Sequence, residues 1–111
     1  MSIMDKQMLL IFADAIQRKR LLRVAFTTRS GEERSRRCAP LDLAPSERAK
    51  IKFYKYHMWD LDSQPKPHLL SLSPEQVIQL EVTAESFMPE QIVIWTRKNP
   101  WTIVRDWGNL S

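Results

Sequence analysis

The sequence predicts a mainly β domain, a small β-barrel with an α-helix before it and a tryptophan-rich segment after it. Residues 51–61 bring aromatic and β-branched side chains together without a breaker, which is typical of a strand. Polar residues interrupt both faces of this strand, as expected for a curved barrel strand that buries part of each face. Apolar and polar residues alternate again over 22–28 and 77–84, which predicts further strands.

The helix is predicted within residues 1–20. Apolar side chains recur there every four residues and form one stripe, with Leu9 and Ala13 beside it: Met4, Met8, Phe12 and Ile16. Ser2 is placed to cap the helix, and the basic residues 18–20 suit its C-terminal end. The stripe packs against the barrel in one interpretation and docks a partner in the other.

A β-hairpin follows the helix. Its first strand covers residues 22–28, its turn residues 29–32, and its second strand residues 33–43. Pro40 predicts an edge or a bend in that second strand, because proline cannot donate to a ladder.

The rest of the predicted barrel consists of loops at 44–48 and 62–67 and short strands at 68–72 and 77–84. In the last strand Ile78, Leu80 and Val82 are expected to face inward. We therefore divide a single domain into the helix (1–20), the barrel (21–89) and an extension (90–111).

The extension is too apolar to remain in water. Residues 92–95 predict a short strand or a buried helical turn, and four apolar residues follow: Trp101, Ile103, Val104 and Trp107. They either cover the barrel or form a docking segment, and covering is favoured because large exposed apolar patches are uncommon.

Positive charge is concentrated in one part of the chain. Of the 17 Lys and Arg, 12 lie between Arg18 and Lys55 against 4 acidic residues, a local balance of +8 within a net charge of +4. Such a segment suits an anionic partner, or it forms a solvated face that keeps a small domain soluble.

The order of elements resembles the WYL domain family. The residues that carry the resemblance are Ala15–Arg20 before the first strand, Arg37–Leu43 with its Arg and Pro-Leu, the aromatic pair Phe53-Tyr54, and Asp60–Ser63. The resemblance spans about residues 15–89. It implies an Sm-like or SH3-like small barrel that senses a ligand, often a nucleotide or a nucleic acid. Lys55 stands where the family has leucine, and the arginines of the family's fourth strand are absent.

The basic and aromatic residues predict a binding surface. Arginine holds phosphate in a fork and aromatic rings stack on bases, so a nucleotide or single-stranded nucleic acid is the expected ligand. The candidate residues are Arg34, Arg36, Arg37, Tyr54, Lys55 and Tyr56. In the competing interpretation the arginines only solvate an edge strand and the aromatic residues belong to the core.

A protein-interaction or oligomerisation module is the alternative function. In it the methionine-rich helix and the tryptophan-rich tail dock a second copy or a separate regulator, without binding nucleic acid.

Other functional classes lack support in the sequence. His57 and His68 have no nucleophile placed by a motif, and Gly31 and Gly108 are isolated, so neither an enzyme nor a cofactor is predicted. Cys38 is expected to be a small buried hydrophobe, and one cysteine with two histidines is too little for a zinc site. No signal peptide or membrane span is predicted, so we expect a cytoplasmic protein.

Overall fold

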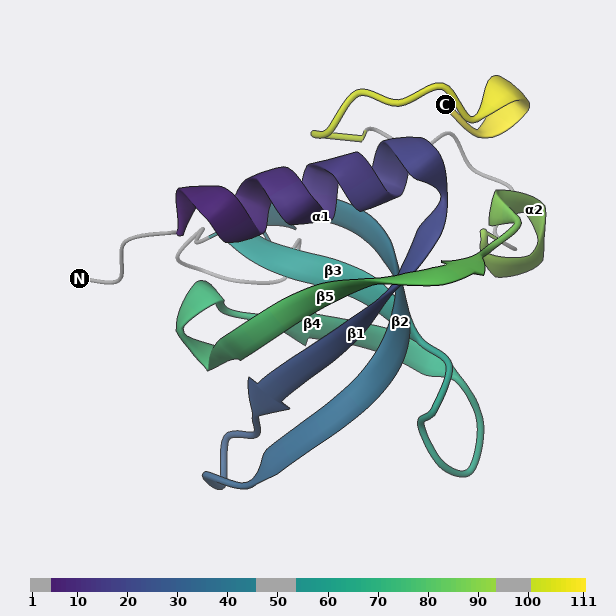
Figure 1. Cartoon of the computed structure of the whole chain (residues 1–111). Coiled ribbons are helices and arrows are strands. Elements are labelled where there is room, and N and C mark those ends of the chain that lie inside the picture. The colour runs from purple at the N-terminus through teal and green to yellow at the C-terminus, as the bar shows by residue number, and fades with distance from the viewer. Residues whose placement is uncertain (1–4, 46–53, 94–100) are drawn as a thin grey trace.

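The computed structural model describes residues 5–45, 54–93 and 101–111. Five antiparallel strands form one sheet in the order β4-β3-β2-β1-β5 (Figure 1). The strands are β1 (Arg20–Thr27), β2 (Glu33–Pro45), β3 (Tyr54–Asp60), β4 (His68–Leu72) and β5 (Val77–Ser86). The other elements are the helices α1 (Lys6–Arg18) and α2 (Pro89–Ile92) and the 3₁₀ turns η1 (Pro74–Gln76) and η2 (Gly108–Leu110). The mainly β prediction is confirmed, but a closed barrel is not, because β4 and β5 remain the two edges of an open sheet.

Helix α1 begins later than predicted. Its N-cap is Asp5, whose Oδ1 accepts hydrogen bonds from the N–H groups of Gln7 at 2.8 Å and Met8 at 3.1 Å. Ser2 and Met4 lie outside the described residues, and the prediction of Ser2 as the cap is wrong. A carboxylate suits this position because it satisfies free N–H groups and favours the positive end of the helix dipole.

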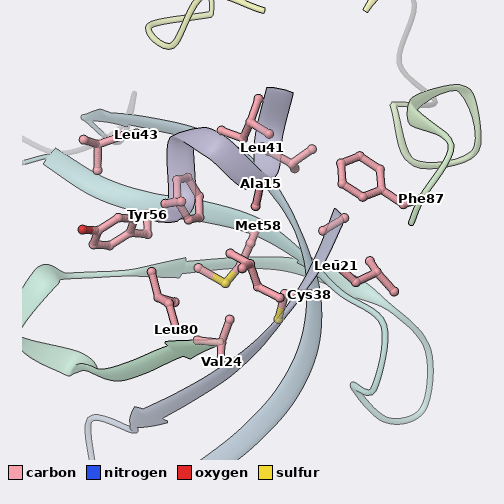
Figure 2. Close-up of a cluster of buried hydrophobic side chains, with 14 of the residues drawn as sticks. Ala15, Leu21, Val24, Cys38, Leu41, Leu43, Tyr56, Met58, Leu80 and Phe87 are labelled. Atoms are coloured by element: carbon pink, nitrogen blue, oxygen red, sulfur yellow. The ribbon is translucent and has the colours of Figure 1, made fainter. Parts of the chain in front are cut away.

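The core lies between α1 and the concave side of the sheet. Phe12 and Ile16 of the predicted stripe are fully buried, and the Phe12 ring meets the ring of Tyr56 edge-on at 4.8 Å. Figure 2 shows Tyr56, Met58 and Val24 projecting into one interior. Strand β3 therefore faces the core with its even-numbered side chains, while the other face of the strand is only half-buried.

Pro40 lies in the central strand of the sheet, so an edge position is wrong and the predicted bend is correct. The pairing of β2 with β3 shifts between Pro40 and Asp42, which leaves Leu41 as an extra residue. A bulge accommodates proline because one ladder hydrogen bond is already missing there. The bulge also turns Asp42 to the face opposite its expected one, where it pairs with His57.

Strand β5 departs from its predicted alternation. Leu80 is buried, but Ile78 and Val82 are 47% and 43% exposed. Phe26 pairs with Val77 and Ala25 with Gln79, so Ile78 has no partner in β1 and the alternation breaks. The inward position predicted for Ile78 is therefore wrong. Val82 does lie on the predicted inward face, opposite the buried Leu22, but it remains exposed because β5 is an edge strand.

The C-terminal segment packs on the side of α1 that faces away from the sheet (Figure 1). The Trp107 indole Nε1 donates to the Ile16 carbonyl at 2.9 Å, and its ring meets the ring of Phe87 edge-on at 5.7 Å. The helical turn α2 spans Pro89–Ile92 and thus precedes the predicted range of 92–95, with which it shares only the buried Ile92. Ile94 and Trp95, which belonged to the same prediction, lie outside the described residues.

Candidate functional site

The three candidate arginines of β2 do not share one face. Arg36 pairs with Val24, whose side chain is buried in the core, so Arg34 and Arg36 extend from the concave face. Arg37 pairs with Arg23 on the opposite, convex face. A single ligand on one face therefore reaches at most part of the predicted cluster.

Each of these arginines is held by a carboxylate. Arg34 Nη2 lies 2.6 Å from Glu32 Oε2, and Arg36 Nε lies 3.5 Å from Asp60 Oδ2. The side-chain hydrogen bond from Arg34 is the main cause that lowers the pKa of Glu32. Asp60 is 2% exposed, so its charge is compensated inside the protein by Arg36 and by the N–H of Asp62 at 2.9 Å.

Arg37 makes the most extensive of these contacts. Its Nη2 and Nε lie 3.0 Å and 3.2 Å from Asp62 Oδ1, and its backbone N–H donates to Asp62 Oδ2 at 2.8 Å. Its Nη1 also lies 3.5 Å from Glu85 Oε2. These hydrogen bonds raise the pKa of Arg37 and lower that of Asp62. Carboxylates already occupy the guanidinium edges that a phosphate would use.

The aromatic part of the predicted site lies elsewhere. Tyr54 pairs with Pro45, eight residues along β2 from Arg37, which is about 26 Å along the strand at ~3.3 Å per residue. Lys55 pairs with Ala44, so it too lies at this end. Tyr56 is 1% exposed and belongs to the core, while Tyr54 is exposed. The structure therefore does not bring the predicted arginines and tyrosines together.

Cys38 is fully buried between these charges, as expected for a small hydrophobe. Burial is the main cause that raises the pKa of its thiol, and the nearby carboxylates of Asp60 and Asp62 raise it further. A thiolate stabilised by Arg36 is therefore not formed at this position.

His57 has partners that sequence motifs did not reveal. Its Nδ1 lies 2.7 Å from Ser71 Oγ across the β3–β4 ladder, and its Nε2 lies 2.8 Å from the Ala44 carbonyl oxygen. His68, the other histidine, is exposed and pairs with Asp60 in the same ladder. Only the pairing register of β3 with β4 could have indicated Ser71, since the two residues are 14 positions apart.

A second polar cluster, here called the Asp42 clamp, consists of Asp42, Trp101, Arg105 and Trp107. The Asp42 carboxylate accepts from the N–H groups of Thr102 and of Ile103, each at 2.9 Å, and from Arg105 Nη2 at 3.4 Å. The Arg105 guanidinium lies 3.9 Å and 4.4 Å from the ring centres of Trp101 and Trp107. Its side chain is fully buried, and this burial lowers its pKa to about 10 despite the attraction of Asp42.

No family model, curated protein or solved structure matches this chain.

The described residues also contain no group of three or more His, Cys, Asp or Glu side chains arranged to hold a metal ion. Among the helices in the described part of the chain, none is long and apolar enough to cross a membrane.

Two surfaces of the described residues remain partly exposed. One is the exposed edge of β5, and the other is the arginine group of β2, which keeps about a third of each side chain exposed: Arg34 39%, Arg36 31% and Arg37 39%.

Proposed function

We propose that this chain is an interaction module of the WYL-like, Sm-like small-barrel type that pairs the free edge of β5 with another strand. The fold proposal is supported by the strand order and by the helix that precedes β1. It is also supported by the link between the two edge strands, because only Ser73 and η1 separate β4 from β5. A link this short keeps the two edges close at one end of the sheet.

The exposed edge of β5 carries this proposal. The strand is ten residues long and contains neither proline nor lysine, and its exposed side chains include Ile78 and Val82. Natural edge strands are usually protected by short length, lysine, proline, bulges or a covering element. The pairing of β5 with β1 is irregular near both ends but regular from Gln79 to Val82, so this middle segment presents a regular edge. Among the described residues no strand pairs with the outer edge of β5. Strand addition would satisfy its backbone groups and cover both aliphatic side chains.

The proposed occupant is β5 of a second copy. Antiparallel pairing about a two-fold axis at Leu80 sets Ile78 of one copy opposite Val82 of the other, and Gln79 opposite Glu81. Moving the axis to Glu81 would instead place two like charges opposite each other, which is unfavourable. Within each copy Glu81 pairs with Arg23 and Glu85 contacts Arg37, so the acidic residues of this edge are compensated.

Light scattering coupled to size-exclusion chromatography tests this proposal. The protein is expected to form a dimer whose fraction grows with concentration, and Val82→Lys is expected to produce the monomer by placing a charge at the centre of the edge. Glu90→Lys on α2 is the matched control, because Glu90 is exposed and lies off the edge. A monomer at all concentrations, or a dimer unaffected by Val82→Lys, would refute pairing through β5.

Binding of a nucleotide or single-stranded nucleic acid is the second proposal. The partial exposure of Arg34, Arg36 and Arg37 supports it, since a phosphate could displace the carboxylates that hold them. Tryptophan fluorescence during titration with short RNA, DNA and nucleotides at two salt concentrations tests it. A saturable change that weakens with salt and is lost in Arg36→Ala/Arg37→Ala is expected. No change with any ligand would exclude this proposal.

A further inference from the structure

Ser71 and His57 form a polarised pair on the convex face of the sheet. A carbonyl oxygen only accepts hydrogen bonds, so the contact with Ala44 at 2.8 Å requires the proton of His57 to be on Nε2. In the neutral imidazole Nδ1 then has a free lone pair, and the Ser71 hydroxyl, whose Oγ lies 2.7 Å away, donates to it. The Ala44 carbonyl thus fixes the tautomer that makes the histidine a base toward the serine.

We propose that Ser71 is a nucleophile, with His57 as its general base, that accepts acyl groups from activated carboxylic esters. The arrangement has the three parts such a site needs: a hydroxyl, a base within hydrogen-bond reach, and a third group that orients the base. This inference is independent of the proposed pairing through β5, because Ser71 lies on β4.

The surroundings of the pair favour a small ester with an aryl leaving group. Trp59 pairs with Leu69 on the same face, two residues along each strand from His57 and Ser71. Leu69 is 50% exposed. This apolar pair can receive an aryl group. Lys55 lies two residues from His57 in the other direction on the same face of β3, so this face carries a cation that is suited to stabilise an oxyanion.

Asp42 also pairs with His57, from β2, but its carboxylate accepts hydrogen bonds from Thr102, Ile103 and Arg105. His57 is therefore oriented by the Ala44 carbonyl and not by a carboxylate. We accordingly expect a slow reaction that requires a good leaving group.

The reaction is an ordinary acyl transfer. Ser71 Oγ attacks the carbonyl carbon of the ester while its proton moves to His57 Nδ1. The bond from the carbonyl carbon to the leaving oxygen breaks, and the protonated imidazole returns the proton to the leaving group. Water then attacks the acyl-serine with His57 again taking the proton, which releases the carboxylic acid and restores Ser71.

Intact-mass spectrometry after incubation of the full chain with a nitrophenyl ester and with a fluorophosphonate tests this inference. We expect one covalent adduct, located on Ser71 by peptide mapping and absent in Ser71→Ala. His57→Gln should slow labelling about 100-fold or more, because its amide can still donate to Ala44 but cannot take a proton. Circular dichroism of each variant verifies that it is folded.

Ser35→Ala is the matched control, since Ser35 is an exposed serine on β2 that pairs with Ala25 and not with a histidine. Its labelling rate should equal that of the unmodified protein. Absence of an adduct on Ser71, equal labelling of Ser35, or a rate unchanged in a folded His57→Gln variant would overturn the inference.

Discussion

Replacing Asp42 with alanine is expected to lower the free energy of unfolding by several kcal/mol, because Asp42 holds the C-terminal segment in place. The substitution removes the acceptor of two backbone N–H groups and the counter-ion of Arg105, whose side chain is fully buried. Among the described residues Arg105 Nη1 has no hydrogen-bond partner, so the variant would hold a buried cation that faces the Ile103 carbonyl and two tryptophan rings but no counter-ion. Breaking a buried ion pair from one side typically costs about 3–5 kcal/mol.

The variant can avoid burying the unpaired charge of Arg105 by detaching the C-terminal segment, but this detachment destabilises the protein by a similar amount. The C-terminal segment can detach so that Arg105 becomes hydrated, but Trp107, which is 3% exposed, then loses its packing. Loss of a buried tryptophan side chain costs about 3–5 kcal/mol. Both routes therefore predict a free energy of unfolding about 3–5 kcal/mol lower than that of the unmodified protein.

Urea unfolding followed by circular dichroism and by tryptophan fluorescence measures this loss. Asp106→Ala is the matched control, because Asp106 is the exposed neighbour of Arg105 and its replacement should change stability by less than about 0.5 kcal/mol. If the segment detaches, the fluorescence of the native Asp42→Ala variant should also shift to longer wavelength. A loss below about 1 kcal/mol for Asp42→Ala would refute the role of Asp42 as the anchor of the segment.

Three further predictions concern the core and the charged residues. Phe12→Ala should lower the free energy of unfolding by about 3–5 kcal/mol, whereas Leu10→Ala, at a 66% exposed position of the same helix, should have little effect; similar losses would contradict the packing. Cys38 should resist a disulfide reagent in the native state, because burial raises its pKa, and should react in urea; rapid native labelling would show that it is accessible. Because Arg37 lowers the pKa of Asp62 below its ordinary value of 3.8, the pair stabilises the fold above that pH and loses this effect as the pH falls through the lower folded value. Thermal unfolding between pH 2 and pH 5 should show this dependence weakened in Asp62→Asn, and identical curves would argue against it.

Much of the fold follows from local sequence patterns. The hairpin turn is one example. Gly31 adopts a φ of +90°, which other residues rarely reach, so the glycine alone is enough to predict a turn at this position. The departures from prediction arise where pairing decides the outcome. Pro40 reads as an edge signal by itself, but β3 lies beside it and the chain accommodates the proline with a bulge. Ile78 likewise fits a regular alternation, but a separate register shift in the pairing of β5 with β1 leaves it without a partner in β1.

The candidate site was less predictable, because its parts meet only through the sheet. Periodicity places Arg34 and Arg36 on one face and Arg37 on the other, but it cannot show that β3 runs antiparallel to β2 with Tyr54 at the far end. The Asp42 clamp was missed for the same reason, since Asp42 and Arg105 are 63 residues apart.

The charge of the basic segment shows why a balance counted along the chain differs from one counted in space. Residues 18–55 carry +8, but the sheet brings against them carboxylates from outside that segment, namely Asp60, Asp62, Glu81 and Glu85. On the convex face Arg37 and Arg23 are directly opposite each other, an unfavourable pair that Asp62 and Glu81 flank on either side. The arginines are thus needed to neutralise acidic neighbours before they can attract an anion, and a phosphate ligand would have to compete with carboxylates already in place. This competition is the physical reason for ranking pairing through β5 above nucleic-acid binding.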